Sequence, residues 1–169
     1  KRGMGREAVA VKADVGETDE CRDLVRRTNE AFGQVDILVS NAGIGQSHKI
    51  VDTPDEEWER VMNVNVRATF ALTRELFPGM RERKYGRIVT ISSNCALTGT
   101  AQGSFVTYAT SKGALNTLTK GIAHEGAPYI TANAICPGST VRSSAEERGE
   151  EWPPSPSDHD NNITFLGMR

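Results

Sequence analysis

The chain of 169 residues is long enough for one domain with its own hydrophobic core. Its 20 basic and 22 acidic residues give a formal net charge of −2, which argues against a binder of nucleic acid or of anionic membrane surfaces. Hydrophobic residues make up 37% of the chain and there are 16 glycines, so the composition is that of a globular domain and excludes disorder throughout.

Short apolar runs alternate with longer amphipathic segments, a pattern typical of a parallel sheet covered by helices. The predicted strands are rich in valine or isoleucine and span residues 8–11, 35–39, 87–91 and 130–135. Their unbroken apolar character indicates strands that are buried on both faces.

Helical spacing of apolar residues predicts helices over residues 18–32, 53–78 and 105–125. Thr18 and Thr53 are the expected N-caps of the first two, Pro54 fits a first helical turn, and Gly33 supplies a C-terminal stop. Asparagine is a poor helix former, so Asn65 inside the second helix would be explained by a local break there.

The apolar pattern ends after residue 135. Residues 139–162 are rich in serine and glutamate and include the run Trp152-Pro153-Pro154-Ser155-Pro156, which predicts a polar, proline-stiffened loop. We expect a single domain over residues 1–169, in which residues 139–165 form a mobile lid over the substrate.

The cysteines, at positions 21, 95 and 136, are far apart and form no C-x-x-C pair. This favours reduced thiols and a cytoplasmic protein over a disulfide framework. The three histidines share no ligand spacing with each other or with a cysteine, so no metal site is expected. No apolar run approaches the ~18 residues that a membrane-spanning helix needs.

Small residues follow the second and third predicted strands. The second runs into Asn41-Ala42-Gly43, and the third ends at Ser92-Ser93. In a parallel α/β sheet, ligands bind beyond the carboxyl ends of the strands, and small residues there let a ligand approach the backbone. Each turn by itself is also explained as a common loop turn or as a helix cap.

Tyr108 and Lys112 lie four residues apart near the start of the third predicted helix. This spacing puts both side chains on one face, one turn apart. A nearby ammonium favours the phenolate form of a tyrosine, which can then exchange a proton near neutral pH. Such a pair alone is also compatible with a solvated helix face.

In this combination and order, the residues resemble the classical short-chain dehydrogenase/reductase family, which includes 3-oxoacyl-acyl-carrier-protein reductases. The matching motifs are, in chain order, Asp14-Val15, Asn41-Ala42-Gly43, Asn65, Ser93, Tyr108-x-x-x-Lys112 and Pro137-Gly138. The resemblance implies a Rossmann-type α/β fold: a doubly wound parallel sheet between two helical layers.

The resemblance also implies an NAD(P)-dependent oxidoreductase that interconverts a carbonyl and a secondary alcohol. Tyr108 would be the general acid and base, and Lys112 would support its ionisation and bind the nicotinamide ribose. Ser93 would polarise the substrate oxygen, and Asn65 would hold a water that links Lys112 to solvent.

The same resemblance implies a binding site for NAD or NADP. Asp14 and Val15 would contact the adenine, and Thr140 is our choice among the hydroxyls that would hold the carboxamide. The other residues implied at the cofactor are Asn41, Ala42, Gly43, Tyr108, Lys112, Pro137 and Gly138.

Two departures from the family pattern are visible. The interval from Ser93 to Tyr108 is long, which predicts an enlarged loop at the substrate mouth. No glycine-rich phosphate-binding turn precedes Asp14, so the sequence is interpreted as an internal fragment, truncated at both ends and inactive by itself.

Other functions remain open on the same fold. One is a catalytically inactive dinucleotide-binding regulator or an inactive fragment, which the set of Asn65, Ser93, Tyr108 and Lys112 disfavours. Another is an epimerase or dehydratase that also uses a Tyr-x-x-x-Lys pair. The expected partner is a small carbonyl or alcohol substrate, with no nucleic acid and no membrane, in a homodimer or homotetramer.

Overall fold

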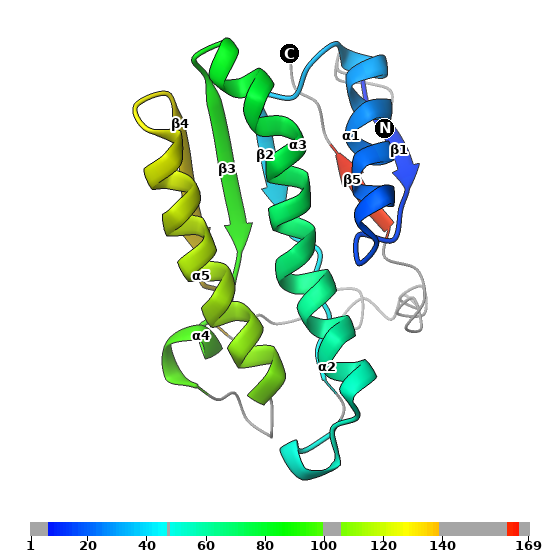
Figure 1. Ribbon diagram of the computed structural model, residues 1–169, viewed down its shortest axis with the longest axis vertical. Helices are drawn as coiled ribbons and strands as arrows, with labels where there is room; N and C mark the ends of the chain where they lie inside the picture. Colours follow the sequence, from blue (N-terminus) through cyan, green and yellow to red (C-terminus); the bar gives the residue numbers. More distant parts are fainter. Residues whose placement is uncertain (1–6, 47, 100–105, 139–161, 166–169) are drawn as a thin grey trace, which may run out of the picture.

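The computed structural model describes residues 7–46, 48–99, 106–138 and 162–165. Long helices and short strands alternate along the chain (Figure 1). In order, the elements are β1 (Val9–Lys12), α1 (Thr18–Phe32), β2 (Ile37–Ser40), the 3-10 turn η1 (Ile50–Asp52), α2 (Asp55–Met62), the π-helical turn η2 (Asn63–Arg67), α3 (Ala68–Glu82), β3 (Gly86–Ile91), α4 (Cys95–Thr98), α5 (Val106–Gly126), β4 (Ile130–Ile135) and β5 (Asn162–Phe165). None of the helices in these ranges is long and apolar enough to cross a membrane.

The strands β2, β3 and β4 form a parallel sheet in that order, which confirms the predicted parallel α/β arrangement. The long helices α1, α3 and α5 all lie on the same side of the strands in Figure 1. On the opposite face, Ile37, Val39 and Ile135 are each about half exposed. The described residues therefore form two of the three predicted layers.

The hydrophobic core lies between this sheet and the helices. It contains Leu24 of α1, Leu72 and Met80 of α3, Ile88 of β3 and Ile130 of β4, all at most 1% exposed. Gly86 begins β3 directly against the helix: a Cβ at this position would lie 2.5 Å from the Met80 sulfur. The core thus packs α1 and α3 against the strands of the sheet.

Buried hydroxyl groups link the sheet to the helices. The Ser40 and Thr69 hydroxyl oxygens are 2.6 Å apart, and those of Thr90 and Thr119 are 2.8 Å apart. Ser40 and Thr90 are also register partners in the ladder between β2 and β3. Thr73 differs, because its buried hydroxyl has no hydrogen-bond partner among the described residues.

The predicted N-caps of two helices are wrong. Helix α1 begins at Thr18 itself with Glu17 as its cap residue, and Pro54 occupies the cap position of α2. The Thr53 hydroxyl donates instead to the Lys49 carbonyl at 2.9 Å, which closes the η1 turn. Gly33 ends α1 as predicted, with φ of 82° and its N–H donating to Asn29.

Two elements lie where the sequence predicts an enlarged loop and a lid. The short helix α4 lies within the enlarged loop expected after Ser93, and β5 covers residues 162–165, which had been assigned to the lid. β5 pairs with β1 in antiparallel register, so this segment is a strand. The remainder of the expected lid, residues 139–161, lies outside the described residues.

Candidate active site

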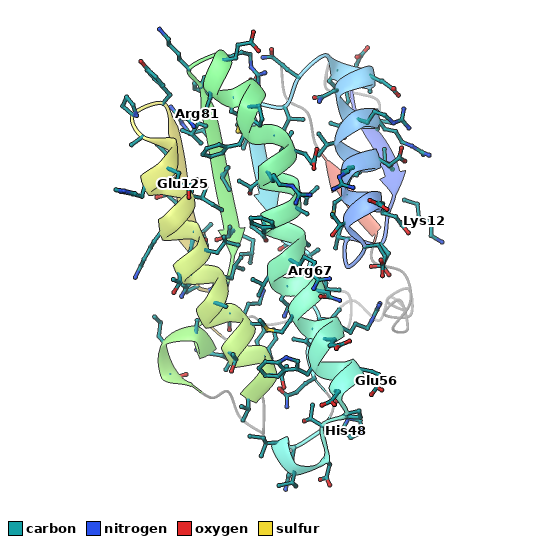
Figure 2. The ribbon with its side chains drawn as sticks, viewed as in Figure 1. Lys12, His48, Glu56, Arg67, Arg81 and Glu125 are labelled. Atoms are coloured by element: carbon teal, nitrogen blue, oxygen red, sulfur yellow. The ribbon has the colours of Figure 1, made fainter. Side chains whose placement is uncertain are left out.

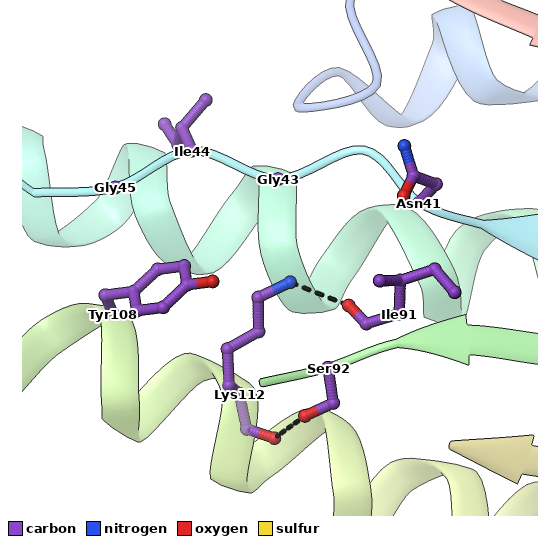
Figure 3. A pocket seen from close by; sticks show the side chains of 8 residues that line it. All are labelled: Asn41, Gly43, Ile44, Gly45, Ile91, Ser92, Tyr108 and Lys112. Carbon is purple, nitrogen blue, oxygen red and sulfur yellow. Dashed lines mark hydrogen bonds between the residues drawn. The ribbon is translucent and has the colours of Figure 1, made fainter. Parts of the chain in front are cut away.

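A cavity of about 460 Å³ opens beyond the carboxyl ends of β2 and β3 (Figure 3). Three segments build it: the turn after β2, the end of β3 and the first turns of α5. Its lining residues are Asn41, Gly43, Ile44, Gly45, Ile91, Ser92, Tyr108 and Lys112. The predicted Asn-Ala-Gly turn and the predicted Tyr-x-x-x-Lys pair therefore meet in one cavity.

Lys112 is buried at the base of this cavity, with 3% of its surface exposed. Its Nζ donates a hydrogen bond of 2.8 Å to the Ile91 carbonyl, and its own carbonyl accepts one of 3.1 Å from the Ser92 hydroxyl. Burial lowers the pKa of the ammonium from its ordinary value of 10.5, because desolvation disfavours the charged form. The end of β3 thus holds Lys112 at both its side chain and its main chain.

Tyr108 lies one helical turn before Lys112, as the spacing predicts. The Lys112 ammonium is 5.6 Å from the centre of the Tyr108 ring. In Figure 3 the phenol hydroxyl points along the cavity toward the lysine side chain. The pair presents a proton donor and a cation to the same space.

Asn65 lies in η2, the predicted break in the second helix, and is 1% exposed. Its Oδ1 accepts a hydrogen bond of 2.8 Å from the Ile44 N–H, and its Nδ2 donates to the Ile44 carbonyl at 3.0 Å. The same Nδ2 also donates to the Ser111 hydroxyl at 2.9 Å. Both amide protons are therefore used to hold the turn after β2 against α5.

Ser93 directly follows the cavity-lining Ser92 and is 8% exposed. Its hydroxyl accepts from the Cys95 N–H at 3.2 Å and donates to the Asn94 side chain at 3.4 Å. These bonds make Ser93 part of the turn that starts α4. The cavity lining includes neither Ser93 nor Asn65.

Gly43 provides the close approach expected of the turn after β2. A Cβ at this position would lie 3.1 Å from Lys112 Nζ and 3.4 Å from Asn65 Oδ1. The absence of a side chain therefore keeps the space beside the ammonium open. An open backbone turn beside a cation, at the carboxyl edge of a parallel sheet, leaves room for a ligand to approach the backbone.

Asp14 and Val15 shape the turn between β1 and α1. Asp14 Oδ1 accepts from the Gly16 N–H at 2.9 Å, and the Asp14 N–H donates to Glu20 at 2.6 Å. Val15 is 1% exposed, and its carbonyl accepts a hydrogen bond from the Cys21 thiol. These residues do not line the cavity with Tyr108.

Pro137 and Gly138 follow β4 and lie beside the turn after β3. The Pro137 carbonyl accepts from the Asn94 N–H at 2.9 Å, and a Cβ on Gly138 would be 3.8 Å from Asn94 Nδ2. The expected Thr140 lies outside the described residues. The predicted proline-glycine turn therefore meets the segment that carries Ser93.

Gln46 is a buried polar residue at the site that the sequence interpretation missed. It is 7% exposed, and its side-chain oxygen accepts a hydrogen bond of 3.0 Å from the Tyr108 N–H. The two residues are 62 positions apart, so no local pattern in the sequence indicates this contact.

Comparisons with known proteins agree with this geometry. The short chain dehydrogenase family matches residues 1–152. The chain therefore belongs to the short-chain dehydrogenase family, and its sheet and helices are those of a Rossmann-type α/β fold.

Particular relatives are similar over most of this chain. It is 39% identical to D-beta-hydroxybutyrate dehydrogenase from Cupriavidus necator, over 75% of this chain and 48% of that protein. It is 42% identical to acetoacetyl-CoA reductase from Rhizobium meliloti, over 75% of this chain and 52% of that protein. The crystal structure of gox2181 superimposes with a TM-score of 0.72 at 33% identity, over 75% of this chain and 50% of that one. The chain spans about half the length of the curated relatives it matches.

Proposed function

We propose that the protein is an NAD(P)-dependent oxidoreductase that interconverts a carbonyl and a secondary alcohol, with Tyr108 as general acid and base. The observation that carries this proposal is the cavity shared by Tyr108 and Lys112, with the ammonium 5.6 Å from the ring. Membership of the short-chain dehydrogenase family supports the same reaction class.

The roles of the pair follow from its position. Bound NAD(P)H would supply the hydride for carbonyl reduction. The Tyr108 hydroxyl donates its proton to the carbonyl oxygen, or accepts the alcohol proton in the reverse direction. The nearby Lys112 ammonium stabilises the negative charge that proton transfer leaves on the phenol oxygen.

Asn65 is proposed to hold the water that connects Lys112 to solvent. Its two amide protons are used, but Oδ1 accepts one protein hydrogen bond and an amide oxygen has two lone pairs. Asn65 Oδ1 and Lys112 Nζ both lie next to Gly43, which leaves the space between them open. Ser93 is proposed to polarise the substrate oxygen from the end of β3.

The cofactor site is proposed to extend across the carboxyl edge of the sheet. Asn41, Ala42 and Gly43 would face it from the turn after β2. Asp14 and Val15 would serve the adenine, with Pro137, Gly138 and Thr140 at the nicotinamide. We further propose a cytoplasmic protein, in keeping with the free thiols of the three described cysteines. The family resemblance is the basis for proposing that it acts as a homodimer or homotetramer.

The test is turnover by the full-length protein with NADH and NADPH against a panel of carbonyl compounds. The panel includes acetoacetate and an acetoacetyl thioester, because two relatives are named as a hydroxybutyrate dehydrogenase and an acetoacetyl-CoA reductase. Tyr108→Phe is expected to lower kcat by ~100-fold or more, the loss typical of a missing general acid. Tyr85→Phe is the matched control, since that ring is 42% exposed and stacks against Arg87. Equal turnover of Tyr108→Phe and the wild type would contradict the mechanism.

A further inference from the structure

Gln46 connects two parts of the molecule through its buried amide. Its Nε2 donates a hydrogen bond of 2.7 Å to the His48 carbonyl, and its Oε1 accepts one of 3.0 Å from the Tyr108 N–H. Both ends of the side chain therefore have defined partners, and the side chain is 7% exposed. Such an amide holds its neighbours in place, because breaking either bond leaves a buried polar group without a partner.

The bond to Tyr108 satisfies the start of helix α5. The described part of α5 begins at Val106, so the Tyr108 N–H lies in its first turn, where an acceptor from outside the helix can satisfy it. An oxygen acceptor at this end is also favoured by the positive end of the helix dipole. In this protein the acceptor for the Tyr108 N–H comes from the loop after β2, 62 positions earlier in the chain.

The Nε2 end of the Gln46 side chain is anchored near helix α2. Its partner His48 lies at the end of the molecule where η1 and α2 begin (Figure 2). The His48 ring nitrogen Nδ1 is 2.6 Å from a Glu57 carboxylate oxygen, which ties this loop to α2. The position of Oε1 is thus set by a chain of contacts that runs from α2 to α5.

We propose that Gln46 is a positioning residue for Tyr108: by capping the first turn of α5, it sets the place of the phenol relative to Lys112. The inference rests on the proposed role of Tyr108 as general acid and base. The second turn of α5 is tied to η2 through Ser111 and to β3 through Lys112. The Gln46 bond fixes the same helix at its first turn, at the main-chain N–H of Tyr108 itself.

Steady-state kinetics of the full-length protein test the proposal. Gln46→Met keeps the length of the side chain and removes both hydrogen bonds, and we expect a fall in kcat of ~10-fold to ~100-fold, the scale of small misplacements of a reacting group. The KM for the cofactor is expected to stay within about twofold, because Lys112 is held by Ile91 and the turn after β2 is held at Ile44 by Asn65. Gln34→Met, an exposed glutamine whose amide contacts only Asp36 in the hydrogen bonds described, is the matched control.

Gln46→Glu distinguishes the effects of the two hydrogen bonds that the amide makes. It retains an oxygen for the Tyr108 N–H and loses the proton for the His48 carbonyl. We expect kcat to lie between those of Gln46→Met and the wild type, since the acceptor for the Tyr108 N–H is kept while its anchor at His48 is lost. Equal losses in Gln46→Met and Gln46→Glu, or an unchanged kcat in Gln46→Met, would overturn the proposal.

Hydrogen exchange at the Tyr108 amide gives a readout that does not depend on turnover. We expect exchange to be at least ~10-fold faster in Gln46→Met than in the wild type, with no change in α1. Unchanged exchange at Tyr108 would overturn the inference even if the enzyme is active. A wild type that is inactive with every carbonyl would instead overturn the proposed function. The exchange measurement would still show whether Gln46 protects the Tyr108 N–H.

Discussion

The ammonium of Lys112 donates its 2.8 Å hydrogen bond to the main-chain carbonyl of Ile91, the last residue of β3. This bond joins helix α5 to the end of the sheet, beside the cavity that Lys112 lines. It also places a cation in a buried position, where desolvation lowers its pKa. The arrangement makes the stability of the fold dependent on the protonation of one lysine.

Comparison of the wild type with Lys112→Met should reveal this dependence. The folded pKa of Lys112 lies below the unfolded value of 10.5, so in the window between them the unfolded state binds more protons. The free energy of unfolding of the wild type should therefore rise relative to Lys112→Met as the pH increases toward 10.5. Denaturant titrations of both proteins across this range give the difference. A difference that falls with pH would contradict the assignment.

Thr73→Val should stabilise the protein. The buried Thr73 hydroxyl has no partner among the described residues, so its replacement by a methyl group removes a desolvation cost of about 1 kcal/mol. Thr69→Val is the matched control on the same helix: it should destabilise by about 1–2 kcal/mol, because Ser40 then loses its partner. Thermal unfolding of the two variants should shift in opposite directions.

Gly43→Ala should weaken cofactor binding. The new methyl group would lie 3.1 Å from Lys112 Nζ, so the ammonium must move away from the turn. We expect the affinity for NAD(P)H to fall by ~10-fold, as for other small misplacements in a site. Gly121→Ala on α5 meets no atom within 4 Å and should leave the affinity unchanged while gaining up to ~1 kcal/mol of helix stability. Titration of NADPH fluorescence measures the cofactor affinity of both variants. Equal affinities would contradict the prediction.

Cys21 should resist alkylation in the native protein. Burial, followed by the nearby carboxylates of Asp14 and Glu20, raises the pKa of this thiol to about 11. Since the thiolate is the reactive form, iodoacetamide at about pH 8 should modify the half-buried Cys136 first. Peptide mass spectrometry of timed samples identifies the order. Modification of Cys21 at the rate of Cys136 would show that Cys21 is not buried in the native protein.

The sequence predicted those parts of the fold that local patterns specify. The strand over residues 130–135 and the helix over residues 18–32 have the observed bounds, and α5 is shifted by one residue from its prediction. The break at Asn65 followed from its poor helix propensity. Strand β5 was missed because its partner is β1, at the other end of the chain, and such pairing leaves no local signal.

In the candidate site, too, local patterns predicted some features, whereas contacts between distant residues were not predicted. Tyr108 and Lys112 were placed together by helix geometry alone, and the turn at Gly43 by its small residues. The bonds from Asn65 to Ile44 and from Gln46 to Tyr108 join residues 21 and 62 positions apart. They depend on the packed arrangement of η2, α5 and the loop after β2, which no periodicity in the sequence encodes.

The hydroxyl pairs beneath the site also select how the strands align. Ser40 and Thr90 are register partners, and each reaches a threonine of a different helix, Thr69 or Thr119. Sliding β2 by one residue so that Val39 takes the place of Ser40 would turn Ser40 to the opposite face and leave the Thr69 hydroxyl facing a valine. Each such misalignment would bury a hydroxyl without a partner. The two pairs therefore penalise misfolded sheets more than they strengthen the native one, and an engineer who repacks this core must replace both members of a pair together.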